Sequence, residues 1–224
     1  MKLTKRTKEV LSQFSLMDGY IKFKKGKKQA LINTHKTVLV EAELDQEIPK
    51  EFGPIPIKDF VRLLEMFDDP EVAFKSEQIV VKEGEAELLV NSIELTDFPI
   101  GKEVNFPPNG IVLNLSKSVV EKIKKLKRTM GKNVLEIVGD GSAVYLRTVS
   151  RWIPICDHEM VTKIGETDRV FSLSLRLSEL NLVADSYTVH LSNRSIVKMC
   201  SESSKLTYYV ALENMDYFDQ KVCQ

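Results

Sequence analysis

The chain has 224 residues, of which 43% are hydrophobic and 29% charged, and its 32 basic side chains balance 32 acidic ones. This composition is typical of a soluble globular protein and excludes intrinsic disorder. No stretch is apolar enough for a membrane span, and Ser12, Gln13 and Ser15 interrupt the apolar run that a signal peptide needs. The three cysteines lack a C-x-x-C spacing, which argues against a disulfide framework or a zinc site.

A first helix is predicted to begin after Thr4, which is a good N-cap residue, because Val10, Leu11 and Phe14 then fall on one side of the helix. The opposite side is basic. Residues 2–14 carry one acidic side chain against four basic ones, which are Lys2, Lys5, Arg6 and Lys8.

Strand-like runs follow at residues 20–23, 29–33 and 37–44, and the first two form a predicted hairpin. The turn of this hairpin carries four lysines around Gly26, namely Lys24, Lys25, Lys27 and Lys28. Such a cluster is either a solubilising hairpin tip or a binding element, and the sequence leaves both interpretations open.

A second helix is indicated by Phe60, Leu63, Leu64 and Phe67 and is stopped by Pro70. Three strands are then expected at residues 72–74, 79–82 and 87–90. A segment rich in proline and glycine follows, with neither helical nor strand periodicity. We therefore expect a first domain at residues 1–98, a linker at 99–110 and a second domain at 111–224.

The second domain is predicted to open with another basic helix. Ser118 and Glu121 match a capping box, and the expected buried stripe consists of Val119, Ile123, Leu126 and Met130. Residues 116–132 hold seven basic side chains against one acidic one. Those expected to face solvent are Lys117, Lys122, Lys124, Lys125, Arg128 and Lys132.

The rest of the second domain follows the first. A hairpin is expected at residues 133–138 and 143–149, a strand at 171–175, and a second helix on the weaker pattern of Leu177, Leu180 and Val183. The strands expected after it are residues 187–191, 196–199 and 206–212.

Two sequence echoes support a tandem duplication. Leu3-Thr4-Lys5 recurs as Leu115-Ser116-Lys117, 112 residues later, and residues 76–82 resemble residues 192–198 at an offset of 116. Two copies of this length are domains rather than solenoid repeats. Both copies begin with a basic helix although the net charge is zero, so the electrostatic field is expected to be polarised. Flexible lysines suit phosphate contacts that carry no sequence information.

Catalysis finds little support in the sequence. Cys156-Asp157-His158 has no third partner, Asp68-Asp69 fits a helix terminus better than a metal site, and a glycine-rich phosphate loop is missing. We therefore expect no enzymatic activity, no metal and no cofactor.

On these features the chain resembles the DNA polymerase sliding clamps, or processivity factors, of T-even-type phages. The resemblance rests on the opening Met1-Lys2-Leu3-Thr4-Lys5, the domain order with basic helices first, the proline-rich connector and the length. It rests also on the ending Tyr208-Tyr209-Val210-Ala211-Leu212-Glu213, which is similar to the tail of the cellular clamp PCNA. The resemblance implies an α+β fold of two tandem clamp domains, each with two helices packed on antiparallel sheets.

The resemblance further implies a homotrimeric ring of six domains around double-stranded DNA, which tethers a DNA polymerase during replication in the cytoplasm of an infected host cell. An ATP-dependent clamp loader would open this ring. Whether transcription machinery is a further partner, as it is for related phage clamps, stays open. Subunits would join through edge strands, with candidates at residues 85–94 and 151–163.

Two sets of site residues are carried over from the resemblance. The basic residues of both first helices would face phosphates, whereas Lys58, Arg62 and Arg176 of the second helices are diluted by neighbouring acids. Partner peptides would dock into an apolar pocket built from Leu31, Phe106, Pro107, Pro108, Tyr209, Val210 and Leu212. The alternative for this pocket is plain core and linker packing. The alternative for the whole protein is a DNA-binding adaptor that does not form a ring and uses its basic helices as a patch.

Overall fold

The computed structural model describes residues 1–94, 104–107, 110–130, 134–149 and 160–221. The chain divides into two compact units, Met1–Val104 and Asn105–Gln224. The expected linker at 99–110 falls partly outside the described residues, so the exact domain limits stay a prediction.

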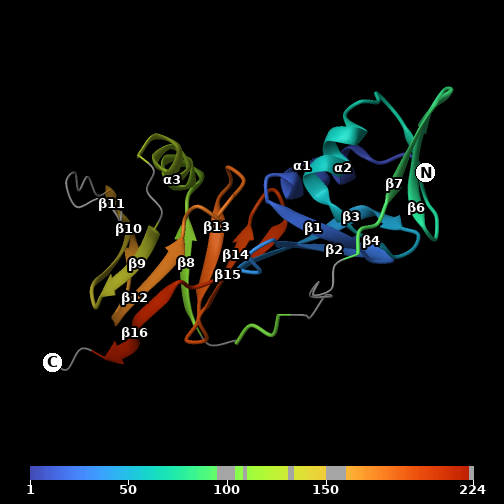
Figure 1. The fold of residues 1–224 in the computed structure, drawn as a ribbon. Helices are drawn as coiled ribbons and strands as arrows, with labels where there is room; N and C mark the ends of the chain where they lie inside the picture. Colours follow the sequence, from blue (N-terminus) through green and yellow to red (C-terminus); the bar gives the residue numbers. More distant parts are fainter. Residues whose placement is uncertain (95–103, 108–109, 131–133, 150–159, 222–224) are drawn as a thin grey trace. The chain divides into compact units, whose positions relative to one another are not determined.

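The first unit contains two helices and two antiparallel sheets (Figure 1). One sheet has the order β4-β1-β2-β3, formed by Phe52–Pro56, Gly19–Phe23, Gly26–Asn33 and Val38–Ile48. The helices α1 (Lys5–Ser15) and α2 (Ile57–Leu64) pack against each other and against this sheet. Phe14, Phe23 and Phe60 are at most 2% exposed and form the centre of the core.

The other sheet of the first unit has the order β5-β6-β7, formed by Glu71–Phe74, Gln78–Glu83 and Ala86–Asn91. The N-terminal residues cover its β5 edge, because Lys2 forms a β-bridge to Glu71 and the Met1 amino group donates to the carbonyl oxygen of Val72 at 2.9 Å. The β7 edge has no strand beside it within the described residues.

The second unit repeats this order with three differences: it has a full strand, β8, before its first helix, it has no second helix within the described residues, and it has an added strand, β16. The strand β8 (Ile111–Leu115) leads into α3 (Lys117–Met130), and β8 pairs with β13 as Lys2 pairs with Glu71. Four strands in the order β15-β14-β13-β8 form one layer, and five strands in the order β11-β10-β9-β12-β16 form the other. The bounds not yet given are β9 Val134–Asp140, β10 Ala143–Val149, β11 Met160–Glu166, β12 Arg169–Arg176, β13 Tyr187–Leu191, β14 Ile196–Ser201, β15 Leu206–Ala211 and β16 Asn214–Lys221.

The second helix predicted for this unit is wrong. Residues 177–179 make a single turn, and an irregular segment runs from there to Ser186. Leu177, Leu180 and Leu182 are all buried, a spacing that does not form one helical stripe. The Ser178 carbonyl oxygen, which a helix would use internally, accepts a hydrogen bond from Lys127 Nζ at 2.8 Å. A contact from α3 therefore replaces the hydrogen bond that would continue the helix.

Candidate nucleic-acid interface

The start of α1 is fixed as the sequence predicts. Thr4 is the N-cap and its Oγ1 accepts from the Thr7 backbone N–H at 3.1 Å. The hydroxyl groups of Thr4 and Thr7 both donate to Asp45 on β3, at 2.5 and 3.2 Å, which holds the first turn against the sheet. Burial opposes the effect of these hydrogen bonds, but the bond from Thr4, the largest effect, keeps the pKa of Asp45 below its usual range.

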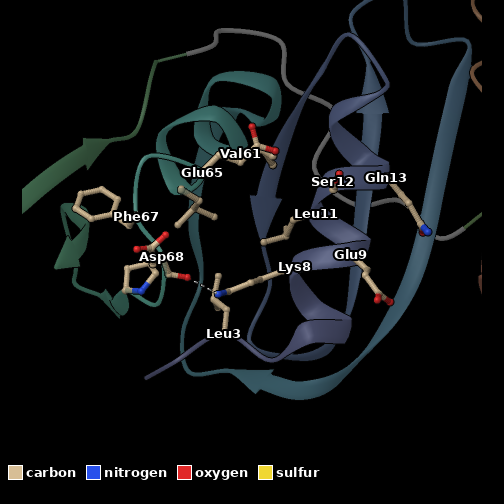
Figure 2. Close-up of a pocket in the computed structure, with 12 residues that line it drawn as sticks. Leu3, Lys8, Glu9, Leu11, Ser12, Gln13, Val61, Glu65, Phe67 and Asp68 are labelled. Carbon is tan, nitrogen blue, oxygen red and sulfur yellow. Dashed lines mark hydrogen bonds between the residues drawn. The ribbon is translucent and has the colours of Figure 1, made fainter. Parts of the chain in front are cut away.

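The basic residues at this end of the first unit are not equivalent. Lys5 is exposed and has no ion pair in the part of the chain that the structure describes. Lys2 instead bonds to Asp69, and that hydrogen bond raises the pKa of Lys2 and lowers the pKa of Asp69. Lys8 reaches the backbone oxygen of Asp68 at 3.5 Å (Figure 2). Lys5 is therefore better placed for an added phosphate than Lys2.

The helix α3 begins two residues earlier than the predicted capping box requires, because a box with Ser118 as N-cap would start the helix at Val119. It starts at Lys117, so Ser118 lies inside the first turn, and the carbonyl oxygen of Ser116 accepts from the Val120 N–H at 3.1 Å. The buried stripe is accordingly centred on Val120 and Ile123, which are 0% and 2% exposed. Val119 and Leu126 lie half-buried at its margins.

The outer face of α3 carries the basic residues that the periodicity predicts. The side chains classed as exposed are Lys117, Lys122, Lys125 and Arg128, while Lys124 is half-buried. Only Glu121 adds an exposed carboxylate to this helix. Lys132 lies outside the described residues.

Lys127 plays a structural part instead. Its Nζ donates to the Ser178 carbonyl oxygen and to Asn181 Oδ1, each at 2.8 Å. Burial, aided by the neighbouring Lys124 charge, lowers the pKa of Lys127. Lys127 thus ties α3 to the segment that replaces the second helix.

The helix α2 and the corresponding part of the second unit, which follows β12, contribute less positive charge than α1 and α3. Arg176 forms ion pairs with Glu179 at 3.0 Å and Glu213 at 3.5 Å. Lys58 and Arg62 are exposed on α2, but Asp59 is exposed beside them. The dilution by acids expected from the sequence is therefore present.

Between α1 and α2 lies a pocket of about 600 Å³ (Figure 2). Its apolar lining includes Leu3, Leu11, Val61 and Phe67, and its charged groups are Lys8, Glu9, Glu65 and Asp68.

In the described residues, no group of three or more His, Cys, Asp or Glu side chains could hold a metal ion. The Cys156-Asp157-His158 sequence lies outside them. Nor does any described helix combine the length and apolar character needed to cross a membrane.

The residues expected to form the peptide pocket differ in their accessibility. Leu31 and Val210 are only 1% and 2% exposed. Phe106, Pro107, Tyr209 and Leu212 are half-buried, and Pro108 lies outside the described residues. Whether these residues form a docking pocket stays a prediction.

Two residues outside the predicted pocket, His190 and Lys198, accompany Phe106 and Tyr209 in the second unit. The Phe106 ring packs edge-on against His190 with centroids 6.3 Å apart, and Lys198 Nζ lies 5.9 Å from the centre of the Tyr209 ring. His190 is directly opposite Lys198 in the β13–β14 ladder, and Lys198 is opposite Tyr209 in the β14–β15 ladder. His190, Lys198 and Tyr209 thus form a row across three strands. Cross-strand pairing of these alternating residues could have predicted this row from the sequence.

No protein-family model matches the chain. In sequence it is 24% identical over 223 residues to the sliding clamp of Vibrio phage KVP40, covering 95% of this chain and 99% of that one.

In structure the chain is similar to a putative DNA polymerase III beta subunit from Eubacterium rectale, with a TM-score of 0.69 and 14% identity over 96% of this chain. It is similar also to the proliferating cellular nuclear antigen of Entamoeba histolytica, with a TM-score of 0.66 and 17% identity, covering 92% of this chain and 94% of that one. A beta clamp of Helicobacter pylori bound to a DNA ligase peptide matches with a TM-score of 0.68 and 11% identity. The chain spans 65% of the length of the two bacterial subunits.

Proposed function

We infer that this chain, which has the sliding-clamp fold and is related in sequence to a phage sliding clamp, acts as a DNA polymerase processivity factor. The observation that carries this inference is the relationship to the phage clamp over nearly the whole of both chains. A basic helix at the start of each unit fits the same function, because duplex DNA presents a dense row of phosphates.

We propose that three copies close into a ring of six units around double-stranded DNA. A ring holds its partner on DNA by topology, so the individual phosphate contacts can remain weak and sensitive to salt. The chain itself then needs no catalytic residues. An ATP-dependent clamp loader would open the ring, and the DNA polymerase would be the tethered partner.

The subunit interfaces of this ring would be formed by two edge strands. The β7 edge exposes Leu89 to 51% and carries Glu87, while the β11 edge exposes Val161 to 51% and carries Lys163. Open edges with apolar side chains are templates for pairing, so Leu89 on β7 of one copy would lie beside Val161 on β11 of the next. The expected candidate at 151–163 overlaps β11 only in part, because residues 150–159 are not described.

Docking of partner peptides is proposed for the surface around Phe106 and Tyr209, where the row with His190 and Lys198 offers aromatic and positive groups. The Helicobacter pylori clamp that binds a DNA ligase peptide supports this proposal by analogy. The expected setting is the cytoplasm of an infected host cell. Recruitment of transcription machinery remains an open extension of the same docking surface.

One experiment separates the ring from a DNA-binding adaptor that is not a ring. The protein is loaded by its loader onto a nicked circular duplex, isolated, and the circle is then cut once with a restriction enzyme. A ring slides off the ends within the incubation, whereas an adaptor stays bound to linear and circular DNA alike. Retention after cutting would exclude the ring.

A further inference from the structure

The hairpin between β1 and β2 carries a cluster of lysines that the two basic helices do not account for. Lys24 and Lys25 join the strands, and Lys27 and Lys28 follow Gly26 at the start of β2. Lys25, Lys27 and Lys28 are exposed, and none of the four ammonium groups has an ion pair among the described residues. Adjacent like charges repel one another, and a bound anion would relieve this repulsion.

The backbone of this turn is held in one conformation. Gln29 is 2% exposed, and its side chain makes three hydrogen bonds to the turn: it accepts from Lys24 N–H at 3.0 Å and donates to the carbonyl oxygens of Lys24 at 2.8 Å and Gly26 at 3.0 Å. Gly26 has a φ of 104°, which other residues adopt only with strain. The lysines are thus presented from a braced turn rather than from a loose loop.

The position of the turn is set by a bulge in β3. Lys28 pairs with Glu43 and Gly26 pairs with Ile48, so Lys27 alone stands opposite residues 44–47. That bulge includes Asp45 and Gln46, the two residues that bind Thr4 at the start of α1. The lysine turn therefore lies at the same end of the sheet as the first turn of α1, which carries Lys5 and Arg6.

The acidic residues at this end do not cancel the positive charge. Glu43, Asp45 and Glu47 are the carboxylates that β3 brings opposite the turn. Asp45 is already engaged by two threonine hydroxyls, at 2.5 and 3.2 Å. Three carboxylates stand against four lysines of the turn and the two basic residues Lys5 and Arg6, which leaves a positive excess.

We propose that the lysine turn, defined as Lys24, Lys25, Lys27 and Lys28, binds the phosphate backbone of the duplex next to the phosphates contacted by the first turn of α1. This inference rests on the proposed function and extends its DNA-contacting surface beyond the helices. Lysine suits the task because a flexible point charge contacts phosphates without reading bases. The partner is nucleic acid rather than an acidic protein, because the turn lies at the same end of the sheet as the first turn of α1, which is proposed to face DNA.

The test compares two variants of the full-length protein with equal loss of charge. Lys25, Lys27 and Lys28 are changed to Gln in one, and three exposed residues of other turns are changed to Gln in the other, namely Lys36 between β2 and β3, Lys75 between β5 and β6, and Arg194 between β13 and β14. Binding to a fluorescent duplex is measured by anisotropy at several low salt concentrations. The slope of log affinity against log salt should fall in magnitude by about 2 to 3 in the first variant, roughly 0.9 per lost phosphate contact, and stay unchanged in the second.

Further measurements separate the possible failures. A third variant, Lys122→Gln with Arg128→Gln on α3, is measured beside the first two, and thermal unfolding checks that all three are folded. If only the α3 variant loses slope, the lysine turn is not a DNA contact and the proposed function stands. If neither loses slope, both proposals fail. If the turn variant keeps its DNA slope but loses binding to a polyglutamate peptide, the turn serves an acidic protein partner and the inference is overturned.

Discussion

Lys127 on α3 lies 2.8 Å from Asn181, measured from Nζ to Oδ1, and so joins residues that are 54 positions apart in sequence. The same ammonium group binds the Ser178 carbonyl oxygen. This contact decides two things at once, because it removes one lysine from the basic face and holds the segment that replaces a second helix.

Changing Lys127 to Met should therefore lower stability and not DNA binding. Methionine keeps the apolar stem but leaves two acceptors without their charged donor, which should cost about 2 kcal/mol of unfolding free energy. Urea denaturation measures this loss, and the salt dependence of DNA binding should be unchanged. Lys122→Met is the matched control. It should leave the free energy of unfolding unchanged and should reduce the salt dependence of DNA binding. A destabilised Lys122 variant beside an unaffected Lys127 variant would refute the assignment.

Asp185 should make stability depend on acid pH. The residue is 5% exposed, and although burial opposes ionisation of its carboxyl group, hydrogen bonds from Ser203, Ser204 and Ser186 lower its pKa to about 2. Because the folded pKa lies below the unfolded value of about 3.9, the stabilisation is complete above that value and is lost as pH falls toward 2.

The Asp185→Asn variant tests this dependence. Near neutral pH it should be less stable than the parent by roughly 2 kcal/mol, the free-energy equivalent of a pKa lowered by nearly two units. The difference should shrink below pH ~4, where the parent carboxylate loses its advantage. The exposed Asp168→Asn is the control and should leave the free energy of unfolding near neutral pH unchanged. A constant gap across the range would contradict the assignment.

Lys198 should hold down the pKa of His190. Burial is the larger cause of the lowered pKa of this imidazole, and the charge of Lys198 is the second. Lys198→Gln is therefore expected to raise the pKa of His190 part of the way toward its ordinary value, as followed by NMR titration of the ring protons. The exposed Lys205→Gln should leave that titration unchanged. An unaltered pKa in the Lys198 variant would remove the charge effect from the explanation.

Leu89 provides a test of the proposed subunit interface at the β7 edge. Leu89→Glu places a charge on the open β7 edge and should convert trimers to single chains without unfolding the unit. Native mass spectrometry gives the assembly state, and circular dichroism reports the fold. Met66, which is 74% exposed beyond the end of α2, serves as the control when changed to Glu. Trimers that survive the Leu89 change would place the joint elsewhere.

Lys5 and Lys2 should differ in their contribution to DNA binding. Lys5→Gln should reduce the salt slope by about 1 if its ammonium contacts one phosphate. Lys2→Gln should reduce the slope less, because the ammonium of Lys2 already bonds to Asp69. Anisotropy titrations at matched salt series compare the two. Equal slopes would show that the ion pair opens on DNA.

Much of the fold follows from local patterns. Thr4 caps α1, and Val10, Leu11 and Phe14 are buried as their helical spacing requires. The hairpins of β1 with β2 and of β9 with β10 form where alternation and turn residues place them. The helix expected from Leu177, Leu180 and Val183 does not form. Its apolar spacing is weak, and Lys127 of α3 donates a hydrogen bond to the Ser178 carbonyl oxygen.

Two similar units, each with a basic amphipathic first helix, can be predicted from the sequence, because periodicity and capping are properties of neighbouring residues. Which positive charges remain available depends on contacts between distant residues, since Lys2 bonds to Asp69 and Lys127 to Asn181 across separations of 67 and 54 residues. The bulge in β3, which places the lysine turn at the same end of the sheet as the first turn of α1, is likewise a product of the tertiary structure. Charges interact through space, so residues distant in the chain settle which lysines can meet a phosphate.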